Sequence, residues 1–167
     1  MKTKPDFFSG RRLLIVTKHE KEAVIAPLLE KALGVTCFVT EDFDTDSLGT
    51  FSGEIARKDD ALTTLRKKCW EGMQAEGFDL AIATEGSFGN HPTVFFAPAN
   101  DELIMLVDQK HNLEIVERVL SMETNFDSSE IHTRDELKAF LDKVQFPSHG
   151  VILKNAAENW TKIYKNI

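Results

Sequence analysis

Residues 79–92 constrain the fold most, because a short apolar strand there runs directly into glycines and polar side chains. Leu80–Ala83 is apolar and contains a β-branched residue, which predicts a buried strand. The chain then reads Glu-Gly-Ser-Phe-Gly-Asn-His over residues 85–91 and reaches Pro92, which predicts that the strand breaks into a polar loop. In α/β proteins ligands bind where strands end at their carboxyl side. We therefore expect a functional site in this loop.

A strand–helix–strand unit precedes that segment. Leu13–Val16 is a continuous apolar run, which is typical of a buried strand. Apolar residues at helical spacing follow it and end at Gly34, a residue that commonly stops helices. The predicted order up to the central strand is strand 13–16, helix ending at Gly34, strand 35–39, polar acidic loop 40–56 and helix 57–75.

The second half of the chain adds a hairpin and further elements. Residues 102–107 and 113–120 have the pattern of two strands joined by a short polar turn. Thr133 and Glu136 have the spacing of a capping box, which predicts that a helix begins there. The last predicted elements are a buried strand over 151–153 and a closing helix over 156–167.

Together these elements predict one α/β domain over residues 11–167, behind a flexible tail of residues 1–10. The domain should have three layers, with a mixed β-sheet between helices on both of its faces. A chain of 167 residues is long enough for one such domain with a substantial core.

Composition excludes several classes of protein. A formal charge of −7 argues against sequence-independent nucleic-acid binding, which needs a basic surface. No apolar run approaches the ~20 residues that span a bilayer, and the first residues have no export signal, so we expect a cytoplasmic protein without membrane contact. Cys37 and Cys69 lack the paired spacing of a zinc site, and we expect both to be reduced. The sequence leaves oligomerisation open.

Familiar catalytic loops do not match the glycine-rich segment. A serine-hydrolase elbow needs glycine two residues before the serine, where Glu85 stands before Ser87, and it needs a helix afterwards. A dinucleotide-binding loop needs G-x-G-x-x-G at the start of a helix, and a P-loop needs G-K-[ST]. Neither pattern occurs here.

Carboxylates at predicted strand and loop ends favour a metal site instead. Glu54, Glu85 and Asp108 are the candidate ligands for Mg²⁺ or Mn²⁺, hard cations that prefer carboxylate oxygens together with waters and substrate phosphates. His91 or Glu85 is the candidate base for a proton transfer. The ordinary alternative is that these carboxylates are surface residues among 27 acidic ones, and that His91 is a structural hydrogen-bonding residue.

Cations and glycines near those carboxylates predict a phosphorylated or otherwise anionic ligand. Lysine and arginine side chains bind phosphate, and glycines let backbone N–H groups approach an anion closely. The candidate substrate-binding residues are Lys18, His19, Arg57, Lys68, Gly86, Ser87 and Gly89.

Three segments resemble an uncharacterised bacterial family known only as a domain of unknown function. They are D-S-L-G-T-F-S-G-E-I-A-R at 46–57, R-K-K-C at 66–69 and A-T-E-G-S-F-G-N-H-P at 83–92. The resemblance implies importance for Gly53, Glu54, Arg57, Lys68, Glu85, Gly86, Ser87, Gly89 and His91. Asn90 stands where that family has proline, and a further region with cysteine pairs in that family has no counterpart here. The order of elements is also similar, more distantly, to the inosine/xanthosine triphosphate pyrophosphatase superfamily, without its S-x-N-x-x-K motif.

Two functions follow as expectations from these residues. The first is a Mg²⁺- or Mn²⁺-dependent phosphohydrolase that acts on a nucleotide or another phosphorylated small molecule. The second is a binding or regulatory module that holds an anionic metabolite without chemistry.

Overall fold

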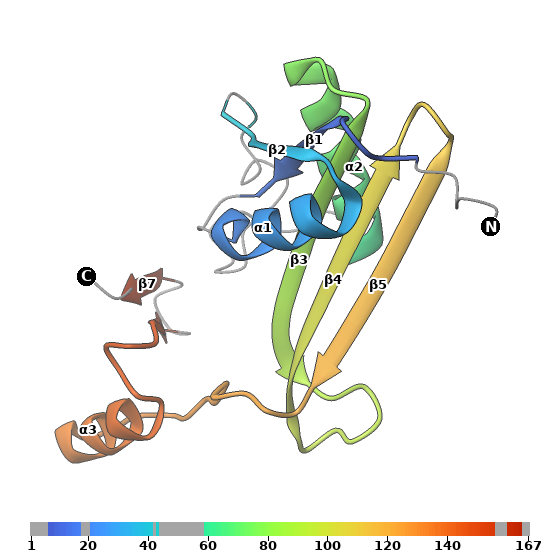
Figure 1. The fold of residues 1–167 in the computed structure, drawn as a ribbon. Helices are drawn as coiled ribbons and strands as arrows, with labels where there is room; N and C mark the ends of the chain where they lie inside the picture. Colours follow the sequence, from blue (N-terminus) through green and yellow to red (C-terminus); the bar gives the residue numbers. More distant parts are fainter. Residues whose placement is uncertain (1–6, 18–20, 42, 44–58, 156–159, 165–167) are drawn as a thin grey trace.

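A computed structural model of the chain describes residues 7–17, 21–41, 43, 59–155 and 160–164. Its centre is a five-stranded sheet in the order β2-β1-β3-β4-β5 (Figure 1). The strands are β1 (Arg12–Val16), β2 (Thr36–Val39), β3 (Leu80–Asn90), β4 (Pro98–Asp108) and β5 (Leu113–Ser121). β1 runs parallel to both β2 and β3, whereas β4 runs antiparallel to β3 and β5. The sheet is therefore mixed, as the sequence predicts.

One helix covers each face of this sheet. α1 (Glu22–Leu33) packs Ile25 and Leu29 against the face that carries Leu13 and Ile15. α2 (Ala61–Glu76) packs on the other face, which carries Leu14 and Val16, through a buried stripe made of Leu65, Cys69 and Met73. Both helices end at glycines with positive φ, Gly34 and Gly77, in the left-handed conformation that glycine adopts without strain. The three-layer α/β prediction is confirmed.

The central strand is longer than predicted. Residues 85–90 were expected to form a loop, but β3 continues through them and pairs with β4 from Leu80 opposite Asp108 to Asn90 opposite Pro98. The ladder supplies partners for the backbone groups of this half of the strand, and that gain outweighs the local tendency of glycines to break a strand. The polar segment is therefore a rigid part of the sheet.

α2 begins later than predicted. Its start was expected at Arg57, but Asp60 has an extended backbone and its side chain accepts hydrogen bonds from the N–H groups of Leu62 and Thr63. This arrangement is an N-cap, which satisfies backbone donors that have no partner inside the helix. The helix therefore begins at Ala61.

The carboxy-terminal elements differ from the prediction in part. α3 (Arg134–Lys143) begins at the predicted capping box, in which Thr133 and Glu136 bond each other's backbone N–H. The helix expected over 156–167 is wrong for residues 160–164, which form β7 (Trp160–Tyr164). β7 pairs with β6 (Val151–Asn155) in a separate two-stranded sheet, and β6 is mostly exposed rather than buried. Aromatic and β-branched residue types dominate β7, and these favour strands.

α3 and the small sheet lie away from the five-stranded sheet (Figure 1). None of the helices in the described part of the chain is both long enough and apolar enough to cross a membrane.

Candidate functional site

The site is positioned by the carboxyl ends of the parallel strands β1 and β3. Val16 of β1 lies opposite Ala83 of β3, so Thr17 and Glu85 come just after the paired region of the two strands. Ala81 and Ala83 face α2, and alternate residues share a face, so Glu85 also points to the α2 side. Glu85 therefore lies at the end of the sheet where α/β proteins bind ligands, on the face that α2 covers.

Lys68 of α2 meets Glu85 there. The Lys68 Nζ donates to Glu85 Oε1, and the two side chains are only 11% and 6% exposed. An ammonium group has three N–H donors, and within the described residues Glu85 is the hydrogen-bond partner found for Lys68. Removing two charges from water costs several kcal/mol per ion, and the attraction within a buried pair often does no more than balance that cost. The presence of this buried pair therefore does not by itself indicate that it stabilises the folded protein.

Thr64 adds a buried hydroxyl on the same side of α2 as Lys68. It precedes Lys68 by four residues, so the two side chains lie on the same side of α2. The Thr64 hydroxyl is buried and has no hydrogen-bond partner among the residues that the structure describes. A buried hydroxyl without a partner costs about 1–3 kcal/mol. We call Thr64, Lys68 and Glu85 the carboxyl-edge site.

The opposite face of the same strand carries a different set of polar groups. Gly86 lies opposite Glu102 of β4, and the Glu102 carboxylate occupies the space above it. A Cβ at position 86 would lie 2.5 Å from Glu102 Oε1, so glycine is what admits the carboxylate. Lys21 binds Glu102 Oε2 at 3.3 Å. Glu85 and Glu102 therefore point to opposite faces of the sheet and do not form one chelating pair.

Asp108 is not part of the carboxyl-edge site, contrary to the metal set predicted from the sequence. It lies opposite Leu80, five residues from Glu85 along β3, which is about 16 Å of strand. Burial alone would raise the pKa of Asp108, but hydrogen bonds from Arg11 and His111 outweigh it and hold that pKa well below its usual range. Within the described residues no group of three carboxylate, histidine or cysteine side chains is placed to hold a metal ion.

His91 is not placed to act as a base for Glu85. It follows Glu85 by six residues, about 20 Å along an extended strand. Its Nδ1 accepts the backbone N–H groups of Thr93 and Val94, both at 3.1 Å. These hydrogen bonds hold the turn after β3, and they support a structural role for His91 rather than a role as a base.

The remaining candidates divide into two groups. Ser87 and Gly89 lie in β3 on the same face as Glu85, by the alternation of the strand, whereas Gly86 faces the other way. Four candidates fall outside the described residues: Lys18, His19, Glu54 and Arg57. Lys18 and His19 directly follow Thr17 in sequence.

The sequence assigned no role to Thr64, although its spacing from Lys68 was a usable signal. Two residues four apart on a helix share a face, and a polar pair on a face that packs on a sheet is unusual. Arg11 and Arg12, which stand immediately before the buried residues of β1, were not predicted as site residues either.

A family model described as a domain of unknown function, DUF6671, matches residues 68–167. The match covers more than half of the chain, and the chain belongs to that family. The matched region begins at Lys68 and includes β3, whereas β1, α1 and β2 precede it. No curated protein sequence matches the chain.

Proposed function

We propose that this domain binds a phosphorylated or otherwise anionic small molecule at the carboxyl-edge site. The observation that carries this proposal is the buried Lys68 ammonium, for which Glu85 is the partner found within the described residues. A phosphate group offers several acceptor oxygens, and lysine binds phosphate as a compact positive charge. The same oxygens would accept a hydrogen bond from the buried Thr64 hydroxyl.

Hydrolysis is the second candidate function, and it rests on Glu85. Mg²⁺ and Mn²⁺ are held by one or two carboxylates together with waters and substrate phosphates, so one carboxylate beside a phosphate-binding lysine is compatible with such an ion. When bound, the ion would polarise a phosphoryl oxygen and lower the pKa of an attacking water. Water would add to phosphorus, and the bond to the leaving-group oxygen would break.

Binding ranks ahead of hydrolysis for a structural reason. Neither Asp108 nor His91 lies near Glu85, so the further metal ligand and the imidazole base predicted from the sequence are not beside it. Binding of an anion needs only Lys68 and a hydroxyl, and both are present.

Thermal unfolding in the presence of nucleotides tests both functions. Nucleoside mono-, di- and triphosphates are added with and without Mg²⁺ or Mn²⁺. A ligand at 100 times its Kd adds about 2.7 kcal/mol of stability, which for a domain of this size raises Tm by roughly 5–11 °C.

The test variant removes both charges of the site together, so that no unpaired charge is left buried, and the control variant changes a lysine outside the site. Lys68→Met combined with Glu85→Gln removes both charges at once, and Lys67→Met changes an exposed lysine one position earlier that pairs with Asp59. We expect the Tm shift in the wild type and in K67M, and its loss in the double variant.

The role of the metal separates the two functions. A shift that needs no metal supports the binding module. A shift that needs metal and nucleotide together, and that is lost in Glu85→Gln, supports hydrolysis. No shift with any nucleotide, or an equal shift in the double variant, contradicts the proposal.

A further inference from the structure

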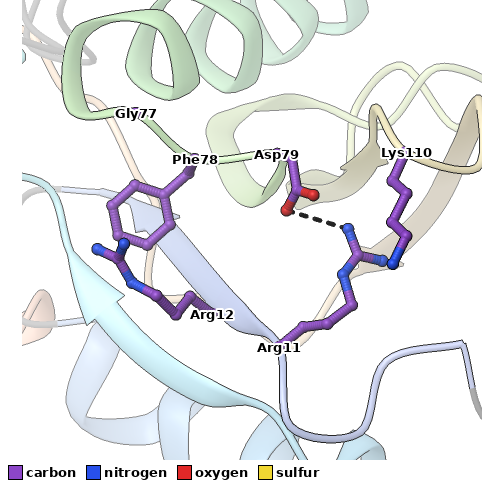
Figure 2. A pocket seen from close by; sticks show the side chains of 6 residues that line it. All are labelled: Arg11, Arg12, Gly77, Phe78, Asp79 and Lys110. Carbon is purple, nitrogen blue, oxygen red and sulfur yellow. Dashed lines mark ion pairs between the residues drawn. The ribbon is translucent and has the colours of Figure 1, made fainter.

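A second polar feature lies at the opposite end of the sheet. Three separate segments line an open hollow of about 450 Å³: the start of β1, the connection from α2 to β3, and the turn between β4 and β5. Its lining residues are Arg11, Arg12, Gly77, Phe78, Asp79 and Lys110 (Figure 2). It is within the size range of small-molecule sites. Three of these six residues are cationic and one is acidic, in a chain whose net charge is −7.

Arg12 is held in place by aromatic rings rather than by a carboxylate. Its guanidinium carbon lies 4.2 Å from the centre of the Phe78 ring and 4.8 Å from the centre of the Phe38 ring. Stacking on aromatic faces orients a guanidinium and leaves its in-plane N–H donors available. Within the described residues no ion pair or hydrogen bond engages the Arg12 side chain, so a fixed set of donors borders the hollow.

Arg11 is the opposite case, because it is already occupied. It binds Asp108 through two nitrogens, at 2.6 and 2.9 Å, and Asp79 at 3.1 Å. Figure 2 shows the Arg11–Asp79 ion pair between Arg12 with Phe78 on one side and Lys110 on the other. Asp79 is 54% exposed despite this pair, so its carboxylate also has access to a ligand.

The hollow is thus lined by positively charged groups on two sides and by a carboxylate between them. Arg12 and Lys110 provide positive charge on the two sides, and Asp79 provides an acceptor between them. The carboxyl end of α2 reaches Gly77, and the carbonyl end of a helix favours positively charged or donating groups. A purely anionic ligand would meet repulsion from Asp79 and from this helix end, whereas a ligand with both an anionic and a donating group would meet complementary partners.

We propose that this hollow binds a small molecule that carries a phosphate or carboxylate group together with an amino or hydroxyl group. Arg12 and Lys110 bind the anionic group, and Asp79 accepts a hydrogen bond from the amino or hydroxyl group. This site is separate from the carboxyl-edge site, since Asp79 precedes Glu85 by six residues along the chain and lies at the other end of β3.

Amide chemical-shift titration of the whole chain tests this proposal. The probes are O-phosphoethanolamine, which carries both groups, and inorganic phosphate and ethanolamine, which carry one each. We expect saturable shifts at the amides of Gly77, Phe78 and Lys110 with O-phosphoethanolamine, and at least about tenfold weaker binding of either single-group probe, equivalent to about 1.4 kcal/mol. Amides around Lys68 and Glu85 report independently on the other site.

Three variants give the test its controls. Arg12→Gln and Lys110→Gln should weaken O-phosphoethanolamine binding by tenfold or more, whereas Arg118→Gln, at an exposed arginine of β5, should leave it unchanged. Asp79→Asn should weaken O-phosphoethanolamine but leave inorganic phosphate equal or tighter, because it removes the negative charge and replaces one carboxylate oxygen with an N–H donor. Absence of saturable shifts at the three amides, or equal affinity in the wild type and Arg12→Gln, would overturn the proposal.

Discussion

Two buried ion pairs lie at different levels of the β3–β4 ladder, Arg11–Asp108 and Lys68–Glu85, and the groups around them differ in their hydrogen bonds. Asp108 receives both Arg11 nitrogens, His111 Nδ1 at 2.7 Å and the His111 backbone N–H at 3.3 Å. Lys68, an ammonium with three N–H donors, has Glu85 as the acceptor found among the described residues, and the Thr64 hydroxyl on the same side of α2 has no partner among them. Asp108 is thus held by several donors of the protein itself, whereas the described residues give Lys68 one acceptor and Thr64 none, so a ligand could complete the hydrogen bonds of these two groups.

Loss of Arg11 should produce the largest effect on stability. Arg11→Leu leaves the fully buried Asp108 carboxylate without its main partner, and breaking such a pair costs about 3–5 kcal/mol. Urea unfolding measures the change. The matched control is Arg118→Leu, which removes an exposed arginine that also binds an aspartate, Asp101, and which should change stability little. Equal effects of the two substitutions would contradict a structural role for the Arg11 network.

The two ion pairs should respond differently when both partners are neutralised. Lys68→Met alone leaves Glu85 charged in a buried position, and we expect a loss of about 3–5 kcal/mol. Adding Glu85→Gln should restore most of that loss, because neither charge then needs burial. Arg11→Leu with Asp108→Asn should recover less, since the donors of His111 lose their charged acceptor. Denaturant midpoints of the four variants measure these changes in stability. Equal recovery in the two double variants would contradict the proposed difference between the Lys68–Glu85 and Arg11–Asp108 pairs.

The pH dependence of stability should follow Asp108. Its pKa in the folded protein is lowered, so its stabilising contribution is fully present above the unfolded-state pKa of about 3.9, begins to fall below that value and is lost as pH approaches the lower folded-state pKa. The stability difference between wild type and Asp108→Asn should be largest above pH 5 or so and shrink below about pH 4. Unfolding in urea at several pH values checks this. A difference that stays constant down to pH 3 would show that the carboxylate charge is not what Asp108 contributes.

The smallest expected effect is that of Thr64→Val, which removes the hydroxyl and keeps the shape of the side chain. A hydroxyl that has no partner carries a desolvation cost, so stability should be unchanged or higher by up to about 1 kcal/mol. Nucleotide binding should weaken at the same time. Thr63→Val is the neighbouring comparison, because the Thr63 hydroxyl bonds Asp60 at the start of α2 and its loss should be destabilising. A loss of stability in Thr64→Val would indicate a structural partner for its hydroxyl.

The helices and strands of the first half could be predicted from the sequence because hydrophobic periodicity and helix-ending residues depend on neighbouring residues in the chain. The apolar run at 13–16, the helix stop at Gly34 and the capping box at Thr133 are all found in the structure. Each of these signals depends on neighbouring residues alone.

The sequence failed where distant pairing decides the structure. Glycines at 86 and 89 predict a loop, yet pairing with β4 holds these residues in a strand. The same ladder sets Asp108 opposite Leu80, which removes one predicted metal ligand from the site of Glu85. The register depends on both strands together. Because side chains alternate between the two faces of the sheet, a shift of one position decides whether two side chains share a face or point to opposite faces. Lys68 and Glu85 were both candidates, but only the packing of α2 on β3 brings them into contact.

The central claim is that the Lys68–Glu85 pair serves a ligand rather than the stability of the fold. Isothermal titration of nucleotides into wild type and the K68M/E85Q variant, together with their unfolding free energies without ligand, tests it most directly. The account predicts similar unfolding free energies and saturable binding by the wild type alone. A double variant that binds nucleotide as the wild type does, or that is several kcal/mol less stable, would contradict it.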